Sequence, residues 1–196
     1  KLAEPHFAML WDGDIPRVRH RGENGALAEV TVIAGTLGGA VPPAPPPRSW
    51  ASRADTEVAI WHVRLEPGAS WRMPAVEREG TLRTLYVFDG HGVDVGGAAL
   101  PVATAAVLRP DLEVPLASEQ GAECLVLQGR PIGEPVAQYG PFVMNTEDEI
   151  RQAFADYRST AFGGWPWDSD EPVNPASQGR FARRPDGVLE QPGATH

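Results

Sequence analysis

Cysteine is nearly absent from this sequence, since Cys124 is the only one among 196 residues. A single cysteine excludes an intrachain disulfide and a metal site built from several cysteines. Cys124 lies in the apolar run 122–127, which favours a small buried side chain over a reactive thiol. A lack of disulfides is typical of a reducing compartment, and together with the net charge of -9 it predicts a cytoplasmic location.

Clusters of positive charge and long apolar runs are missing as well. The chain has 17 lysine and arginine residues against 26 aspartate and glutamate residues, and its longest basic clusters, 17–21 and 180–184, are short. Nucleic-acid binding relies on clustered cations, so no nucleic-acid partner is expected. No apolar run approaches the roughly 18 residues that span a bilayer, so no membrane partner is expected either. Residues 1–5 hold neither an initiator methionine nor a signal peptide, which indicates that the N-terminus was removed by processing or that the sequence is part of a longer chain.

Glycine and proline, in contrast, are abundant, with 21 and 20 residues or about a fifth of the chain. Short apolar runs between such residues are typical of an all-β sandwich or barrel. In 57–65 the alternation places Ala59, Trp61, Val63 and Leu65 on one face, which predicts a core face there. The expected strands are 27–34, 57–65, 82–88, 93–95, 103–108, 113–116 and 123–128.

Two segments between these strands have the composition of loops and turns. Residues 41–47 hold five prolines and cannot pair as a central strand, so they are expected to form an extended surface loop. Asp89, Gly90, His91 and Gly92 give the pattern of a hairpin turn.

One helix is predicted in the C-terminal part of the chain. Thr146 followed by Glu149 gives a capping box, and the acidic first turn suits the helix dipole. Beyond the stop at Gly163, the tail has no regular period, and Trp165 and Trp167 are expected to be its packing anchors. The apolar residues that recur at helical spacing are Ile150, Ala153, Phe154 and Tyr157.

Several blocks of the chain resemble the pirin family, whose members are bicupins with two β-barrels. The most specific block is 127–146, with the acid-capped helix directly after it. Blocks 66–69 and 85–90 resemble a cupin hairpin of that family, and the tail from Trp165 to Arg183 resembles an extension found in some bacterial members. The resemblance covers nearly the whole chain, including segments 4–7, 14–16 and 32–35, which resemble the family's linker and the first strand after it.

The resemblance implies an all-β fold, a cupin-type β-barrel or jelly roll with one C-terminal helix and an irregular tail. Residues 1–26 would be an interdomain linker or N-terminal arm, and 27–140 the C-terminal cupin barrel. Residues 141–196 would be the helix with the Trp- and Pro-rich tail. The family's N-terminal barrel is absent from the chain. Proteolysis, truncation and natural absence all fit the sequence equally.

The family's iron site would lie in the missing half, on a His-x-His pair, a third histidine and a glutamate. Three imidazoles and a carboxylate leave open positions on Fe(II) for substrate and oxygen. Counting forward from Gly68 puts Pro74 and Val76 at the histidine positions, with Gly80 or Thr81 at the glutamate position. Counting back from Gly90 instead puts Glu77 and Glu79, or Val76 and Arg78, at the histidine positions and Arg83 at the glutamate position. No catalytic, metal or cofactor residue is therefore expected here, and Fe(II) is expected in the N-terminal domain.

Two functions of different class follow from the resemblance. The parent would be an iron-dependent bicupin similar to quercetin 2,3-dioxygenase, with this chain as its metal-free C-terminal cupin domain and without turnover of its own. The alternative is a redox- or iron-responsive regulatory module that acts through protein partners. A third interpretation is a barrel that binds a small apolar ligand; Trp61, Trp71 and Phe88 filling the interior would count against it. The sequence identifies neither the substrate nor the regulatory partner, nor the oligomeric state.

The block 138–145 is apolar and aromatic, but it is too short and too rich in glycine and proline to form its own core. We expect it to form, with the helix and the tail, an interface with the missing N-terminal cupin domain. Alternatively, it caps the bottom of its own barrel. Left exposed, such a patch favours self-association. The residues of the expected interface are Tyr139, Phe142, Met144, Phe154 and Trp165, together with Ile150.

Overall fold

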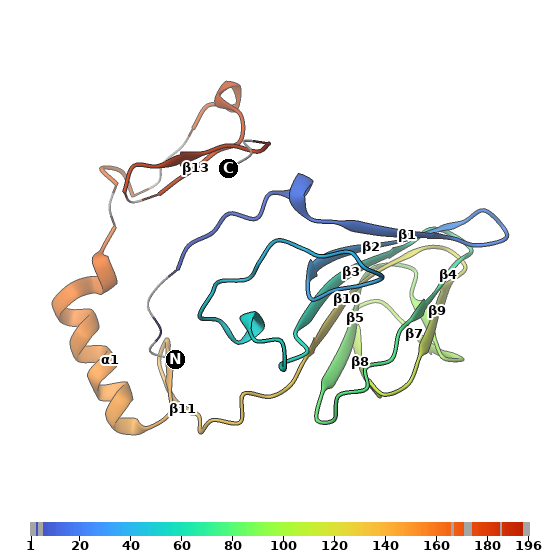
Figure 1. Ribbon diagram of the computed structural model, residues 1–196, viewed down its shortest axis with the longest axis horizontal. Coiled ribbons are helices and arrows are strands. Elements are labelled where there is room, and N and C mark those ends of the chain that lie inside the picture. Colours follow the sequence, from blue (N-terminus) through green and yellow to red (C-terminus); the bar gives the residue numbers. More distant parts are fainter. Residues whose placement is uncertain (1–2, 4–5, 166, 171–173, 185, 194–196) are drawn as a thin grey trace. The chain divides into compact units, whose positions relative to one another are not determined.

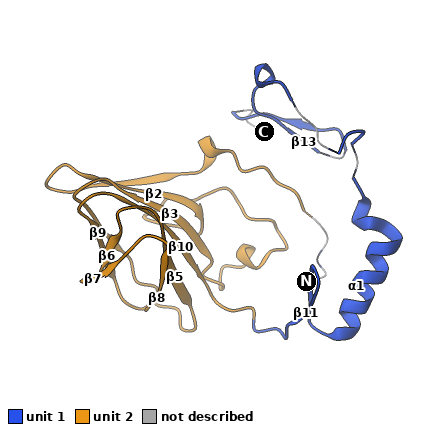
Figure 2. Cartoon of the chain, turned by 180° about the vertical axis from the view of Figure 1, so that it is seen from behind, with its two compact units in different colours: residues 1–5, 133–196 blue, residues 6–132 orange. Residues whose placement is uncertain are grey.

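The computed structural model describes residues 3, 6–165, 167–170, 174–184 and 186–193 (Figure 1). The chain divides into two compact units (Figure 2). One comprises residues 6–132 and is built of strands; the other comprises 133–196 with residues 1–5 and holds the helix. Part of the expected arm (1–2 and 4–5) and part of the expected tail (166, 171–173, 185 and 194–196) lie outside the described residues.

The unit 6–132 consists of two antiparallel sheets. The six-stranded sheet has the order β1-β2-β3-β10-β5-β8, and the four-stranded sheet has the order β4-β9-β6-β7. This arrangement confirms the prediction of a mostly β chain. The strands are β1 Arg17–Arg21, β2 Leu27–Ala34, β3 Ala59–Leu65, β4 Ala69–Met73, β5 Leu82–Gly90, β6 Val93–Val95, β7 Ala98–Leu100, β8 Thr104–Leu108, β9 Val114–Ser118 and β10 Ala122–Gly129, with short 3-10 turns at Asp12–Asp14 and Trp50–Ser52.

Alternation along β3 builds the core face, as predicted. Ala59, Trp61, Val63 and Leu65 are each at most 3% exposed. The intervening His62 is only half-buried, and its Nε2 lies 2.7 Å from a carboxylate oxygen of Glu123 on β10. Period-two alternation in a strand thus sorts this segment into a core face and an outer face.

The interior of this unit is filled by large side chains. The rings of Trp61 and Trp71 meet edge to face with centroids 6.3 Å apart, and Met73 and Leu85 are fully buried beside them. Phe88, in contrast, is 51% exposed. Two of the three aromatic residues whose burial would count against a small apolar ligand in the interior, Trp61 and Trp71, are buried there.

The strand unit differs from the expected barrel 27–140 at both ends. Arg17–Arg21, expected in the arm 1–26, pair with β2 as an edge strand. Arginine-rich sequence fits such a position, because charged side chains protect an exposed sheet edge. At the other end the unit stops at Ile132, and residues 137–144 form a hairpin that contacts the helix instead.

The segment Asp89–Gly92 does not close a hairpin, which corrects the prediction from its sequence. β5 before it belongs to the six-stranded sheet, and β6 after it belongs to the four-stranded sheet. Gly90 and Gly92 do adopt positive φ angles of 89° and 97°. Glycine and aspartate therefore marked the turn correctly, but they do not determine which strand the chain pairs with next.

The second unit holds helix α1, Glu147–Thr160. The capping box is present as predicted, because the Thr146 hydroxyl accepts from the Glu149 backbone N–H at 3.2 Å and a Glu149 carboxylate oxygen accepts from the Thr146 N–H at 3.0 Å. The helix ends at Thr160 rather than at Gly163, since Ala161 already has a left-handed φ of 48°. No helix in the described part of the chain is long and apolar enough to cross a membrane.

Two short hairpins and two 3-10 turns complete this unit. The hairpins are β11 Ala137–Tyr139 with β12 Phe142–Met144, and β13 Ala182–Arg183 with β14 Leu189–Glu190. The turns are Ala161–Gly163 and Ala176–Gln178. Trp165 is 56% exposed and its indole N–H donates to the Ser169 carbonyl at 2.7 Å. Trp165 is therefore no packing anchor, because this local turn satisfies its polar atom at the surface, whereas Trp167 packs against the guanidinium of Arg183.

Replacing Thr146 with alanine is expected to destabilise helix α1 by roughly 0.5–2 kcal/mol, because the N-cap hydrogen bond to Glu149 is lost. Hydrogen exchange of the α1 amides measures this locally. Ser159→Ala is the control. It removes a hydroxyl from the same helix, and that hydroxyl donates only to the Asp156 carbonyl. Equal exchange rates in the two variants would place the true start of the helix elsewhere.

Candidate functional site

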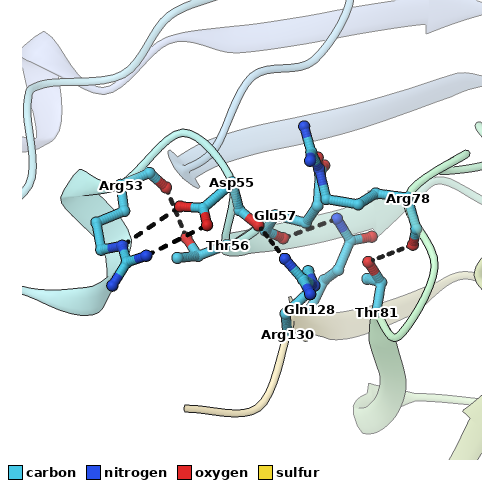
Figure 3. Close-up of polar contacts among 8 residues, drawn as sticks. All are labelled: Arg53, Asp55, Thr56, Glu57, Arg78, Thr81, Gln128 and Arg130. Atoms are coloured by element: carbon cyan, nitrogen blue, oxygen red, sulfur yellow. Dashed lines mark hydrogen bonds and ion pairs between the residues drawn. The ribbon is translucent and has the colours of Figure 1, made fainter. Parts of the chain in front are cut away.

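Three segments of the strand unit meet at one end of the central strands of the six-stranded sheet. Gln128, near the end of β10, pairs with Ala59 at the start of β3 and with Arg83 at the start of β5. The loops before β3 and β5 therefore converge on the last residues of β10 (Figure 3). We call this cluster the mouth site; it consists of Arg53, Asp55, Thr56, Glu57, Arg78, Thr81, Arg83, Gln128 and Arg130.

Arg83 is the buried centre of the mouth site. Its side chain is 0% exposed. Its Nε donates to the Gln128 side-chain oxygen and its Nη1 to the Pro74 carbonyl, both at 2.8 Å. Both acceptors are neutral, whereas buried charges are usually paired with an opposite charge. Burial accordingly lowers the pKa of the Arg83 guanidinium from its ordinary value.

The count from Gly68 places Pro74 at a histidine position, and the separate count from Gly90 places Arg83 at the glutamate position. The structure brings them together, since the Arg83 guanidinium bonds the Pro74 backbone. Neither proline nor a permanently protonated guanidinium is a metal ligand. Among the described residues, no three histidine, cysteine, aspartate or glutamate side chains gather in one place. The residues at these positions therefore do not fit an iron centre.

Gln128 connects the buried arginine to the rim of the mouth site. Its side-chain amide donates to the Glu57 carbonyl at 3.0 Å, and the Glu57 carboxylate accepts from Arg78 Nε at 2.7 Å. Glu57 has a positive φ of 53°, which costs energy for a residue with a Cβ. These two contacts hold Glu57 from its backbone and from its side chain.

The loop before β3 is fixed by Arg130. The Arg130 backbone N–H donates to the Thr56 carbonyl at 2.7 Å and its Nη1 to the Asp55 carbonyl at 3.0 Å. The Asp55 carboxylate pairs with Arg53, and the hydrogen bond from Arg53 lowers the pKa of Asp55. The Trp50 indole N–H donates to the Arg130 carbonyl at 2.8 Å and so fastens the loop to the end of β10. Sequence reasoning found Arg83 by counting, but it missed Arg53 and Arg130 because loop arginines carry no periodic signal.

The strand unit carries hollows of about 820, 350 and 320 Å³. The one of about 320 Å³ belongs to the mouth site, with Thr56, Trp61 and Gln128 among its lining residues. The one of about 820 Å³ is lined by the turns at 68–70, 91–94 and 117–120 and by residues 99–101. The titratable side chains that line the hollow of about 820 Å³, those of His91, Asp94 and Glu119, are all exposed to solvent.

The interface residues expected from the sequence are partly brought together. In the second unit, the Phe142 ring meets Phe154 at 4.8 Å, and Tyr139 meets Phe154 at 5.8 Å between centroids. Met144 is buried in the same cluster. Trp165 makes none of the described ring contacts, and Tyr157 and Phe162 pack on Phe142 instead. We call Tyr139, Phe142, Phe154, Tyr157 and Phe162 the ring cluster.

The outer face of the six-stranded sheet carries an apolar surface that the sequence analysis did not predict. The register aligns Leu127 with Thr84 and Val107, and Leu125 with Tyr86 and Ala105, across β10, β5 and β8. We call it the outer sheet face; its exposed large residues are Leu82 (59%), Tyr86 (40%), Phe88 (51%), Val107 (82%) and Leu127 (38%). An apolar sheet face of this kind is typical of an interaction surface.

Comparison with known proteins gives consistent matches. Residues 60–163 match the family model described as the pirin C-terminal cupin domain. A Pseudomonas aeruginosa protein whose name refers to quercetin 2,3-dioxygenase is 37% identical over 169 residues, 81% of this chain and 53% of that protein. A pirin-like protein of Solanum lycopersicum is 32% identical over 164 residues, 81% of this chain and 50% of that protein.

Solved structures agree with these sequence matches. A crystal structure of quercetin 2,3-dioxygenase from Acinetobacter baumannii matches with a TM-score of 0.61 and 30% sequence identity, over 77% of this chain and 48% of that chain. The cupin-type fold expected from the sequence is thereby confirmed. The chain spans about half the length of the curated relatives it matches.

Proposed function

This chain belongs to the pirin family as its C-terminal cupin domain, and we propose that it is the metal-free half of a bicupin whose N-terminal cupin holds iron. The observation that carries the proposal is the identity of Arg83. A buried guanidinium lies where the count from Gly90 places the carboxylate ligand, and it bonds Pro74, which the count from Gly68 places at a histidine position. A fixed positive charge there opposes a metal cation by direct repulsion.

The match to this chain covers about half of each relative's length, which is consistent with a second domain in the relatives. We propose that this domain packs on the outer sheet face and, in the second unit, on the ring cluster. Tyr139 is 68% exposed although its ring packs on Phe154, which suits a surface that is completed by another domain. The iron-bearing half would then supply the chemistry, and this chain would supply a rigid docking surface.

For the whole protein we propose a non-haem iron dioxygenase that acts on a flavonol, as the names of the relatives suggest. The alternative is a redox- or iron-responsive regulator that binds protein partners without turnover. Turnover of quercetin with oxygen uptake by the iron-loaded full-length protein supports the enzyme. Partner binding that depends on iron, without oxygen uptake, supports the regulator.

This chain alone is expected to bind no stoichiometric iron, copper or zinc, because Pro74 and Arg83 replace ligands. Elemental analysis after dialysis measures this, with the full-length protein as the control that retains iron. About one metal per chain, held by side chains of this unit, would contradict the proposal.

The isolated chain is also expected to self-associate, because burial of the exposed apolar side chains of the outer sheet face is favourable. Val107→Lys should shift light scattering toward the monomer. Leu112→Lys is the control, since Leu112 is 49% exposed in the loop between β8 and β9 and lies off this face. A chain that stays monomeric at high concentration and binds no apolar dye would contradict the proposal that the outer sheet face and the ring cluster are docking surfaces.

A further inference from the structure

Three buried N–H donors around the mouth site have no partner. Trp61 Nε1, Arg83 Nη2 and Arg130 Nε are shielded from solvent and make no hydrogen bond to any described residue. A buried donor left unpaired costs about 1–3 kcal/mol. One such group is common in a protein, but three in one region indicate an acceptor that is not part of the chain.

The three donors belong to one place. Trp61 and Gln128 both line the hollow of about 320 Å³. Arg83 bonds Gln128, and its guanidinium carbon lies 6.0 Å from the centroid of the Trp61 ring. The Arg130 backbone bonds Thr56, another lining residue. Trp61 thus lines the hollow itself, and Arg83 and Arg130 each bond one of its lining residues.

The charges of the mouth site favour an anion. Four arginines stand against two carboxylates, Asp55 and Glu57, and those two pair with Arg53 and Arg78. Arg83 and Arg130 bond neutral acceptors. Glu77 and Glu79 on the neighbouring loop are exposed to solvent, which screens their charge. A local excess of positive charge in a chain of net charge -9 is the reverse of the global balance.

We propose that the mouth site binds a small organic carboxylate. The carboxylate oxygens accept from Trp61 Nε1 and lie in the field of Arg83, while the organic body packs on the Trp61 ring and on Val58 and Ala59, which also line the hollow. The mixture of apolar wall and donors suits an organic acid better than inorganic phosphate, which has no apolar part. This ligand site is independent of the iron that we propose for the N-terminal domain.

Benzoate is the probe, because it combines one carboxylate with an aromatic ring. The chain has six tryptophans, and the indole N–H resonance of Trp61 is identified by its loss in Trp61→Phe. Benzoate should shift this resonance in a saturable manner. Benzamide, the neutral analogue of the same shape, and inorganic phosphate should not do so at the same concentrations.

Variants test the charge. Arg83→Met should weaken benzoate binding about tenfold or more, as expected for the loss of a charged partner. Arg109→Met is the matched control, because Arg109 is exposed and pairs with Asp111 away from the hollow; it should leave binding unchanged. Should Arg83→Met fail to fold, Arg130→Met provides the same test with a side chain at the rim, and it too should weaken binding.

Three results would overturn the proposal. The first is no shift of the Trp61 resonance at several millimolar benzoate. The second is equal binding of benzamide or of phosphate, which would show that an organic carboxylate is not what the site selects. The third is unchanged benzoate affinity in folded Arg83→Met or Arg130→Met. Any of these would leave the unpaired donors as a structural feature only.

Discussion

Replacing Gly90 with alanine is expected to lower the free energy of unfolding of the strand unit by about 3–5 kcal/mol, an effect at the large end for a single substitution. A Cβ at Gly90 would lie 2.5 Å from the Gly121 carbonyl oxygen and 2.7 Å from the Ala122 Cα. Both atoms are backbone, so no flexible side chain can move aside. β5 and β10 would have to separate where their register already shifts, between Glu123 and Cys124.

Gly97→Ala isolates the clash from the backbone strain. Its φ of +91° nearly equals the +89° of Gly90, but nothing lies within 4 Å of the position of its Cβ. The control should therefore lose only the left-handed penalty, about 1–2 kcal/mol. Urea unfolding followed by tryptophan fluorescence measures both variants. Equal losses would mean that the contact between Gly90 and residues 121–122 is looser than described.

The core strands could be predicted from the sequence because burial imposes a period of two. β2 and β6 have the expected bounds, and β3, β5, β8, β9 and β10 differ by at most two residues at each end. β4 was missed, because its residues Trp71 and Met73 alternate with Ser70 and Arg72 over only five residues. The charged strand β1 was missed because its position depends on pairing with β2 rather than on its own pattern.

The mouth site could be predicted only in part. Counting from Gly90 located Arg83 at a ligand position, since cupin spacing fixes where each strand residue falls. The count did not show that Arg83 is fully buried, because arginine is seldom buried without a carboxylate. Its acceptors, the Gln128 side chain and the Pro74 backbone, come from segments 45 and 9 residues away, and no local pattern connects them.

The lone thiol gives the stability of the strand unit a pH dependence. Burial, with a smaller effect of the neighbouring Glu123 charge, raises the pKa of Cys124 from 9.0 to about 12. Between pH 9 and pH 12 the Cys124 thiol loses its proton in the unfolded chain but keeps it in the folded chain. The unfolded state is thereby favoured, and stability falls by about 1.4 kcal/mol per pH unit as pH rises from about 9 toward 12. At pH 11 the expected loss is about 3 kcal/mol relative to pH 7.

Few other groups obscure this effect, because the chain has a single lysine, Lys1, and three tyrosines. Cys124→Ala should be less stable than the natural chain at pH 7, by about 1–2 kcal/mol, because a small cavity replaces a fully buried side chain. Its stability should hardly change with pH, so the order of the two proteins reverses near pH 10. Urea unfolding at a series of pH values tests this. Parallel curves for the two proteins would mean that the Cys124 thiol already ionises in the folded state at its ordinary pKa, and hence that water reaches the core beneath β10.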